Sequence, residues 1–109
     1  MKAGDSGPAM AWCPFPDAES ARAAAKTLLD EQLIACANII PAMQSLFVWN
    51  GVFDEGGEAG MLVKTDAALL HRAVARLAQL HPYDHPAVLG WACDATTPET
   101  ASWLGGLRG

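Results

Sequence analysis

The sequence predicts a small α+β protein in which helices cover one face of a sheet. Three observations support this fold class. Runs of apolar and β-branched residues alternate with longer runs in which apolar residues recur every three or four positions. A length of 109 residues corresponds to one domain. Apolar residues make up 51% of the chain, which favours a packed core over disorder.

The N-terminal part of the chain contains a polar leader, a strand and a helix. Residues 1–7 include Gly and Ser, so we expect a disordered leader followed by a single domain over residues 8–109. The short apolar run Pro8–Phe15 predicts the first strand. Asp17 is a suitable N-cap for a helix over Ala18–Ile34, whose polar and apolar residues fall on opposite faces.

The middle of the chain predicts three strand segments and a hairpin turn. The segments are Ala35–Ile40, Gln44–Phe53 and Met61–Thr65, which are rich in β-branched, aromatic and other apolar residues. Asn50–Gly51 is the strongest local hairpin signal. Asp54–Gly57, which has no apolar side chain, is the competing position for the turn.

The C-terminal part predicts a helix, a strand and a short final helix. The helical spacing of apolar residues covers Ala67–Leu80, with Asp66 as its cap and Pro82 after its end. Pro86–Cys93 predicts the fourth strand, and Thr97 is the N-cap of the last helix. The resulting order, β-α-β-β-α-β and a terminal helix, is typical of a ferredoxin-like sandwich. That fold serves many unrelated functions, so it does not define the chemistry.

Charge and composition exclude several classes of partner. The net charge is −5 and the seven basic residues are scattered, so we expect no nucleic-acid partner. No run of about 18 apolar residues indicates a membrane span. The N-terminus has no apolar stretch typical of a signal peptide. An odd number of cysteines without such a signal argues against a disulfide framework. We therefore expect a cytoplasmic protein.

Two groups of residues are candidates for metal binding. His81, Asp84 and His85 place two imidazoles and a carboxylate within five residues, a donor set that suits Cu(II) or Zn(II). The thiol of Cys36 suits Cu(I). The structural alternatives are a helix-end residue for His81 and a small buried side chain for Cys36. No phosphate-binding glycine motif and no Ser/His/Asp set is present, so we expect no enzyme activity.

Three segments carry a more specific signal. Leu33–Pro41 reads LIACANIIP, Ser45–Gly51 reads SLFVWNG, and His81–Pro86 reads HPYDHP. Glu58 and Lys64-Thr65 follow the second segment, and Trp103 follows the third. In this order the segments resemble L-x-A-C-x-N-x-x-P, S-x-Y-x-W-x-G … E … K-T and H-P-Y-x-x-P … W of the divalent-cation tolerance (CutA) family. The resemblance extends over nearly the whole chain after the leader.

The resemblance implies a homotrimer of ferredoxin-like subunits, similar in architecture to PII signalling proteins. Strands of neighbouring subunits would pair at their edges and cover them. It also implies a role in divalent-metal tolerance and binding of a divalent metal, with copper expected. Under this reading Asp54–Gly57 forms the hairpin turn and Asn50–Gly51 lies within a strand. Phe15 occupies a position where many members have a cysteine.

Two alternative functions remain open at this stage. One is a PII-like sensor that binds a small ligand in a cleft between subunits. The residues expected to line that cleft combine charged and aromatic side chains: Trp49, Glu58, Lys64 and Tyr83. The other is a non-catalytic structural platform.

Overall fold

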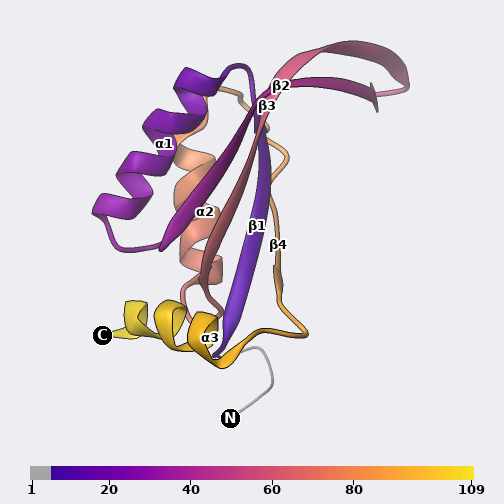
Figure 1. Ribbon diagram of the computed structural model, residues 1–109. Coiled ribbons are helices and arrows are strands. Elements are labelled where there is room, and N and C mark those ends of the chain that lie inside the picture. The colour runs from indigo at the N-terminus through magenta and orange to yellow at the C-terminus, as the bar shows by residue number, and fades with distance from the viewer. Residues whose placement is uncertain (1–5) are drawn as a thin grey trace.

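The structure, a computed structural model, describes residues 6–109 (Figure 1). The elements are, in order, β1 (Pro8–Phe15), α1 (Ala18–Asp30), β2 (Cys36–Trp49), β3 (Val52–Asp66), α2 (Leu70–Leu80), β4 (Leu89–Ala92), α3 (Pro98–Gly105) and a 3₁₀ turn η1 (Gly106–Arg108). Residues 1–5 of the predicted leader lie outside the described part, and Gly7 already bonds to the fold through its amide and carbonyl. The predicted element order is confirmed.

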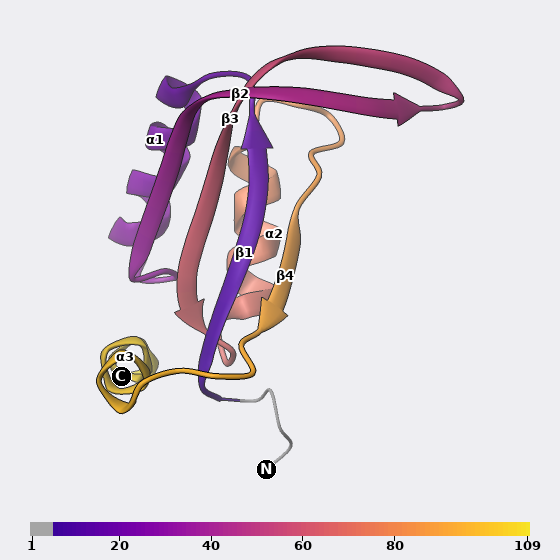
Figure 2. The ribbon, with the colours of Figure 1, turned by 45° about the vertical axis from the view of Figure 1, so that its right-hand side comes forward.

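The four strands form one antiparallel sheet in the order β2-β3-β1-β4. Both long helices, α1 and α2, cover the same face of this sheet (Figures 1 and 2). This is the arrangement of a ferredoxin-like sandwich, as the sequence predicts. Within residues 6–109, no helix has the length and apolar character that a membrane crossing requires.

The core lies between the sheet and the two helices. Alternate residues of β1 are buried because successive strand residues point to opposite faces. Phe15 is fully buried, as are Leu28 of α1 and Leu77 of α2. Burial of each such side chain contributes roughly 1.5–3 kcal/mol. The alanines of α1 let this helix pack close to the sheet.

Helix α1 ends earlier than the sequence predicts. The expected helix extends to Ile34, whereas α1 ends at Asp30. Gln32 adopts a left-handed conformation with φ of 59°, and the Leu33 amide donates to the Leu28 carbonyl. This is a left-handed helix end. It redirects the chain so that Ile34 enters the core.

The hairpin turn lies at Asn50–Gly51. Both residues have positive φ, 52° and 77°, and Trp49 pairs directly with Val52. A two-residue turn of this kind requires residues that tolerate positive φ, which Asn and Gly do. Asp54–Gly57 is instead part of β3 and pairs with β2. The turn position implied by the family resemblance is therefore wrong, and the local signal is correct.

The two predicted segments around Pro41 form one continuous strand, β2. The pairing register shifts between Ile40 and Met43. Proline has no amide to donate to a neighbour, and a bulge on an edge strand accommodates it. Beyond this point the hairpin bends away from the sheet and projects from the body of the molecule (Figure 2). This bend creates the concave surfaces described below.

Two C-terminal boundaries also differ from the prediction. Helix α2 begins at Leu70, because a turn intervenes after Asp66. The predicted Asp66 cap of α2 is therefore wrong, since the N-cap residue is Leu69 and no side chain bonds there. The buried Asp66 carboxylate instead accepts from the amides of Ala68 and Gly7 and pairs with Arg108, which holds the preceding turn. The last strand is limited to Leu89–Ala92. The predicted Thr97 cap is confirmed, since its side chain accepts from the amide of the third residue after it.

Candidate functional site

The candidate site is a cavity of about 530 Å³ at the root of the hairpin. Its apolar wall is the segment Leu46–Trp49 of β2, and Pro14 from the end of β1 closes one side. Four polar residues line it: Ser45 of β2, Glu58 of β3, and Tyr83 and His85 from the loop after α2. A mostly apolar cavity with a few convergent polar groups is typical of a small-molecule site.

A hydrogen bond between Tyr83 and Glu58 connects the two sides of the cavity. The Tyr83 hydroxyl donates to Oε2 of Glu58 over 2.9 Å. Partial burial and this bond to Glu58 raise the pKa of Tyr83 to about 12. The phenol therefore stays protonated at neutral pH and remains a donor.

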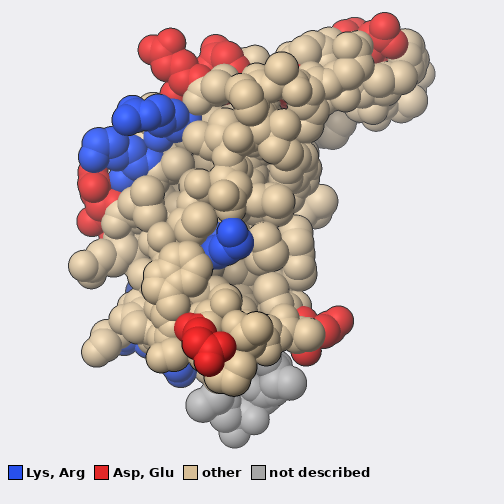
Figure 3. All heavy atoms as spheres, in the orientation of Figure 1, with Lys and Arg blue, Asp and Glu red and all other residues tan. Residues whose placement is uncertain are grey.

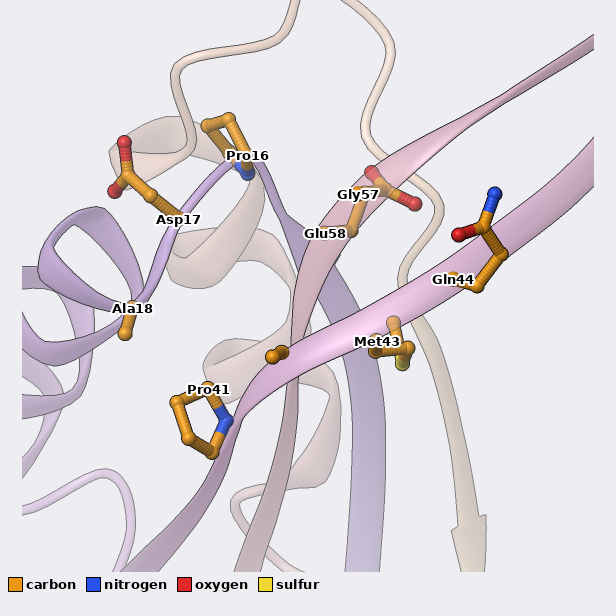
Figure 4. Close-up of a pocket in the computed structure, with 9 residues that line it drawn as sticks. Pro16, Asp17, Ala18, Pro41, Met43, Gln44, Gly57 and Glu58 are labelled. Carbon is orange, nitrogen blue, oxygen red and sulfur yellow. The ribbon is translucent and has the colours of Figure 1, made fainter.

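A second hollow of about 600 Å³ lies on the other side of Glu58, between the start of α1 and the bulge of β2 (Figure 4). Asp17 lines it from the helix side, and Gln44 lines it from β2. The Asp17 carboxylate already accepts from the Ser20 amide at 2.7 Å, and this bond lowers the pKa of Asp17. Glu58 thus lines both the cavity and this hollow, and Asp17 is a second acidic side chain in the hollow.

His81 supports the loop that carries Tyr83. The Tyr83 amide donates to Nδ1 of His81 over 3.1 Å, so that nitrogen is unprotonated. Nε2 then carries the proton and donates to the carbonyl of Pro14 over 2.7 Å. The ring also stacks on Phe15, with centroids 4.2 Å apart. Both nitrogens of this buried ring are therefore engaged within the fold.

The structure does not bring Cys36 together with the predicted histidine ligands. Cys36 pairs with Lys64 of β3, whereas His81 contacts the end of β1 that pairs with Gly60. Four strand residues separate these positions, about 13 Å along the sheet. Asp84 and His85 are exposed beside His81. Within residues 6–109, no group of three His, Cys, Asp or Glu side chains is close enough to hold a metal ion.

Three of the four residues expected in a cleft between subunits line one cavity of the single chain. They are Trp49, Glu58 and Tyr83. Lys64 lies six residues from Glu58 along β3, about 20 Å away. Its amine donates to Oδ1 of Asn38 over 2.8 Å and is 4.0 Å from the Cys36 sulfur. Within one chain, Lys64 is therefore not part of this cavity.

Sequence reasoning missed two features of the site. His85, expected as a metal ligand, also lines the cavity, and the aromatic ring of Phe47 forms part of its wall. Phe47 lies in the S-x-Y-x-W segment, so that motif contained the signal.

Cys13, beside Pro14, is buried, and burial and the Glu58 charge raise the pKa of its thiol to about 12.

The projecting hairpin exposes a large apolar surface. Its exposed side chains retain between 46% and 67% of their accessible surface: Leu46, Phe47, Val48, Trp49, Val52 and Phe53. The helix-free face of the sheet adds further apolar residues, including Leu89 and Trp91. Exposed apolar surface of this extent is unusual on a protein that functions alone and is typical of an interface.

Comparisons with known proteins agree with the fold. Residues 9–106 match the family described as CutA1 divalent ion tolerance protein. The divalent-cation tolerance protein CutA of Pyrococcus horikoshii is 40% identical over 90 residues, which cover 83% of this chain and 87% of that protein. The corresponding protein of Thermus thermophilus is 36% identical over 89 residues, 82% of this chain and 86% of that one.

Solved structures show the same similarity. CutA1 from Ehrlichia chaffeensis superposes with a TM-score of 0.88 at 26% identity, covering 95% of this chain and 97% of that chain. The Thermus thermophilus divalent cation tolerance protein gives a TM-score of 0.86 at 32% identity, covering 94% of this chain and 99% of that chain.

Proposed function

The chain belongs to the CutA1 divalent ion tolerance protein family, and on this premise we propose that it acts in divalent-metal tolerance as a non-catalytic homotrimer that binds a divalent ion, copper being the metal expected. Location in the cytoplasm is part of the same proposal. It is supported by cysteines that are all unpaired within residues 6–109, as in a reducing compartment.

The observation that carries assembly is the exposed apolar hairpin. Six large apolar side chains there keep about half or more of their surface in water. Covering each would contribute on the order of 1 kcal/mol, which in sum can offset part of the entropy cost of association. The hairpin edge of β2 is also unpaired in a single chain, and strand pairing with another copy would satisfy it.

Assembly is tested by measuring molar mass in solution by light scattering. The expected result is a trimer at micromolar concentration. Phe53→Glu places a charge on the apolar hairpin and should lower the mass. Leu29→Glu is the control, because Leu29 is also an exposed apolar residue but lies on α1, outside the hairpin. A monomeric unmodified protein, or equal dissociation by both variants, would contradict the proposal.

The donors of a single chain do not fit a closed site for a divalent metal. His81 would have to give up a hydrogen bond within the fold to bind a metal ion. Cys36, Asp84 and His85 remain as donors with side chains accessible to solvent, but a single chain does not gather them. We therefore propose that metal ligands are contributed by more than one subunit, and we assign no coordination geometry.

Metal binding is tested by calorimetric titration of the reduced protein with Cu(II) and Zn(II). We expect one saturable copper site per subunit that is weakened in His85→Ala and in Cys36→Ser. His71→Ala is the control, since His71 is exposed on α2 and belongs to neither candidate group. Weak, non-saturating heats, or equal losses in the control, would show that copper binding is nonspecific.

The cavity at the root of the hairpin favours a second candidate function, binding of a small ligand in a PII-like manner. Its support is the meeting of Trp49, Glu58 and Tyr83 around one cavity. A thermal-shift panel tests it. A ligand at 100 times its dissociation constant should stabilise the folded state by about 2.7 kcal/mol. Shifts that persist unchanged in Trp49→Leu would place the ligand elsewhere.

A further inference from the structure

A third hollow lies at the end of the molecule opposite to the hairpin, and we name it the C-terminal hollow. Its volume is about 400 Å³. The residues that line it come from the segment after α1, the start of α2 and η1, and are residues 31–33, 68, 69, 72, 107 and 108. Figures 1 and 2 show this end of the molecule away from the projecting hairpin. The C-terminal hollow is therefore not part of the apolar surface that assembly would cover.

Two arginines line the C-terminal hollow, Arg72 of α2 and Arg108 of η1. The side chain of Arg72 is exposed, and within residues 6–109 it has no hydrogen-bond or ion-pair partner. Arg108 pairs with Asp66 through Nε at 3.4 Å, which leaves its two terminal nitrogens as donors. Guanidinium groups bind carboxylate and phosphate groups through two parallel hydrogen bonds. Two such groups at one hollow favour an anion.

The carboxylates around the C-terminal hollow are already paired within the fold. Glu31 lines the hollow, and both of its oxygens accept hydrogen bonds from Arg76 at 2.8 Å. Asp66 has a side chain that is 1% exposed, and it accepts from two backbone amides as well as pairing with Arg108. Arg72 is thus the charged side chain left without a partner, and it gives the hollow a net positive charge.

The hairpin end of the molecule has the opposite character. No Lys or Arg lines the cavity at the root of the hairpin or the hollow beside it. On the face that Figure 3 shows, Lys and Arg side chains lie over the body of the molecule, and none lies on the projecting hairpin. The chain carries a net charge of −5, which repels anions in general. The arginine-lined hollow is therefore the favourable place for an anion among these three cavities.

The remaining lining of the C-terminal hollow is partly apolar. Leu69 is buried, whereas Leu33 and Leu107 are half-buried and keep some surface in contact with solvent. An apolar group of a ligand that covers this surface would contribute roughly 25 cal/mol for each Å² removed from water. We propose that the C-terminal hollow binds a small organic anion, in which a carboxylate or phosphate group is attached to a compact apolar group. This site goes beyond metal tolerance and is separate from the cavity at the root of the hairpin.

The test is calorimetric titration of the full chain, in its assembled state, with four probes. Phenyl phosphate and benzoate combine an anionic group with a ring, inorganic phosphate has no ring, and benzyl alcohol has no charge. We expect saturable binding of at least one of the first two, at least tenfold weaker binding of inorganic phosphate, and no saturation with benzyl alcohol. Saturation with only one of the two ring-bearing anions would support the site and identify the anionic group that it prefers.

Matched variants locate the binding. Arg72→Gln removes the charge and keeps a polar side chain, and it should weaken anion binding about tenfold or more. Arg22→Gln is the control, since it makes the same change at an exposed position of α1 outside the hollow. Both changes affect exposed side chains, so the circular dichroism spectra should be unchanged. Leu107→Ala is a second variant, and it should weaken phenyl phosphate or benzoate more than inorganic phosphate.

Several results would overturn the inference. They are saturation by none of the probes, binding of benzyl alcohol as tight as that of the ring-bearing anions, and equal losses in Arg22→Gln and Arg72→Gln. Anion binding should also persist in Phe53→Glu, because the hairpin does not line the C-terminal hollow. Loss of binding in Phe53→Glu would place the anion at the subunit interface and refute this site. Light scattering and copper titration of the same sample report separately on the trimer and metal proposals.

Discussion

His81 offers the sharpest test of how the loop beside the candidate site is held. We consider His81→Phe, which retains an aromatic ring to stack on Phe15 but has no ring nitrogen. The carbonyl of Pro14 and the amide of Tyr83 would then each lose a partner. The Phe ring is larger than that of His, so the change creates no cavity, but a ring C–H would lie where Nε2 is now 2.7 Å from the Pro14 carbonyl. The cost should therefore combine the two lost hydrogen bonds with some overpacking.

The expected loss is about 2–3 kcal/mol in the free energy of unfolding. A hydrogen bond between neutral groups contributes roughly 1 kcal/mol, and an unsatisfied buried group costs roughly 1–3 kcal/mol. Tyr83 is exposed, so water can bind its amide once His81 is replaced, and the cost of losing this hydrogen bond lies near the low end of that range. Pro14 is half-buried, so its carbonyl accounts for the larger share.

Urea unfolding at one fixed subunit concentration measures this loss, since the stability of an oligomer depends on concentration. The control is His71→Phe, the same change at an exposed position of α2, which should alter stability by less than about 0.5 kcal/mol. Equal stability of the two variants would refute the assigned role. So would a fully folded His81→Phe protein that loses copper binding, because the ring would then be a metal ligand.

Three further predictions follow from local geometry. Gly51→Ala should destabilise the protein by roughly 1–2 kcal/mol in thermal unfolding, because φ at this turn position is 77°. The Cys13 thiol should resist iodoacetamide at pH 8.5 while the more exposed Cys36 reacts, as read by mass spectrometry, because burial raises the pKa of Cys13 to about 12. The hydrogen bond from Arg76 lowers the pKa of Glu31, so the stabilising effect of this pair should be present above the ordinary pKa of Glu. It should be lost as the pH falls through the lower pKa of folded Glu31. Comparing the stability of Arg76→Gln with that of the unmodified protein over pH 2–6 measures this loss.

Each of these three predictions has a control variant or an outcome that would contradict it. Gly56→Ala should be neutral or stabilising, since Gly56 lies in β3 without a positive φ, and no atom lies within 4 Å of the place that an added Cβ would occupy. Rapid labelling of Cys13 in the folded protein would contradict its burial. A stability difference between Arg76→Gln and the unmodified protein that does not shrink at low pH would show that the guanidinium acts by packing rather than by its charge.

Several features of the fold could be predicted because their causes are local. The Asp17 cap needs only a side chain that accepts a hydrogen bond from the amide three residues later. The turn needs only two neighbouring residues that tolerate positive φ. Asn50–Gly51 provides the second condition, and the resemblance-based alternative failed because it overrode this local preference. The early end of α1 at Asp30 was missed because Gln32 is an unusual residue for a left-handed position.

The element order, the Asp17 and Thr97 caps, the turn signal and the family all follow from the amino-acid sequence alone, since hydrophobic periodicity and motifs are properties of neighbouring residues. Which functional side chains meet depends instead on the tertiary structure. Glu58 reaches Tyr83 across 25 positions of sequence, and His81 reaches Pro14 across 67. These contacts require the order of strands in the sheet and the bend of β2 after Ile40. For the same reason Cys36, although part of a recognisable motif, lies at the other end of the sheet from the histidines.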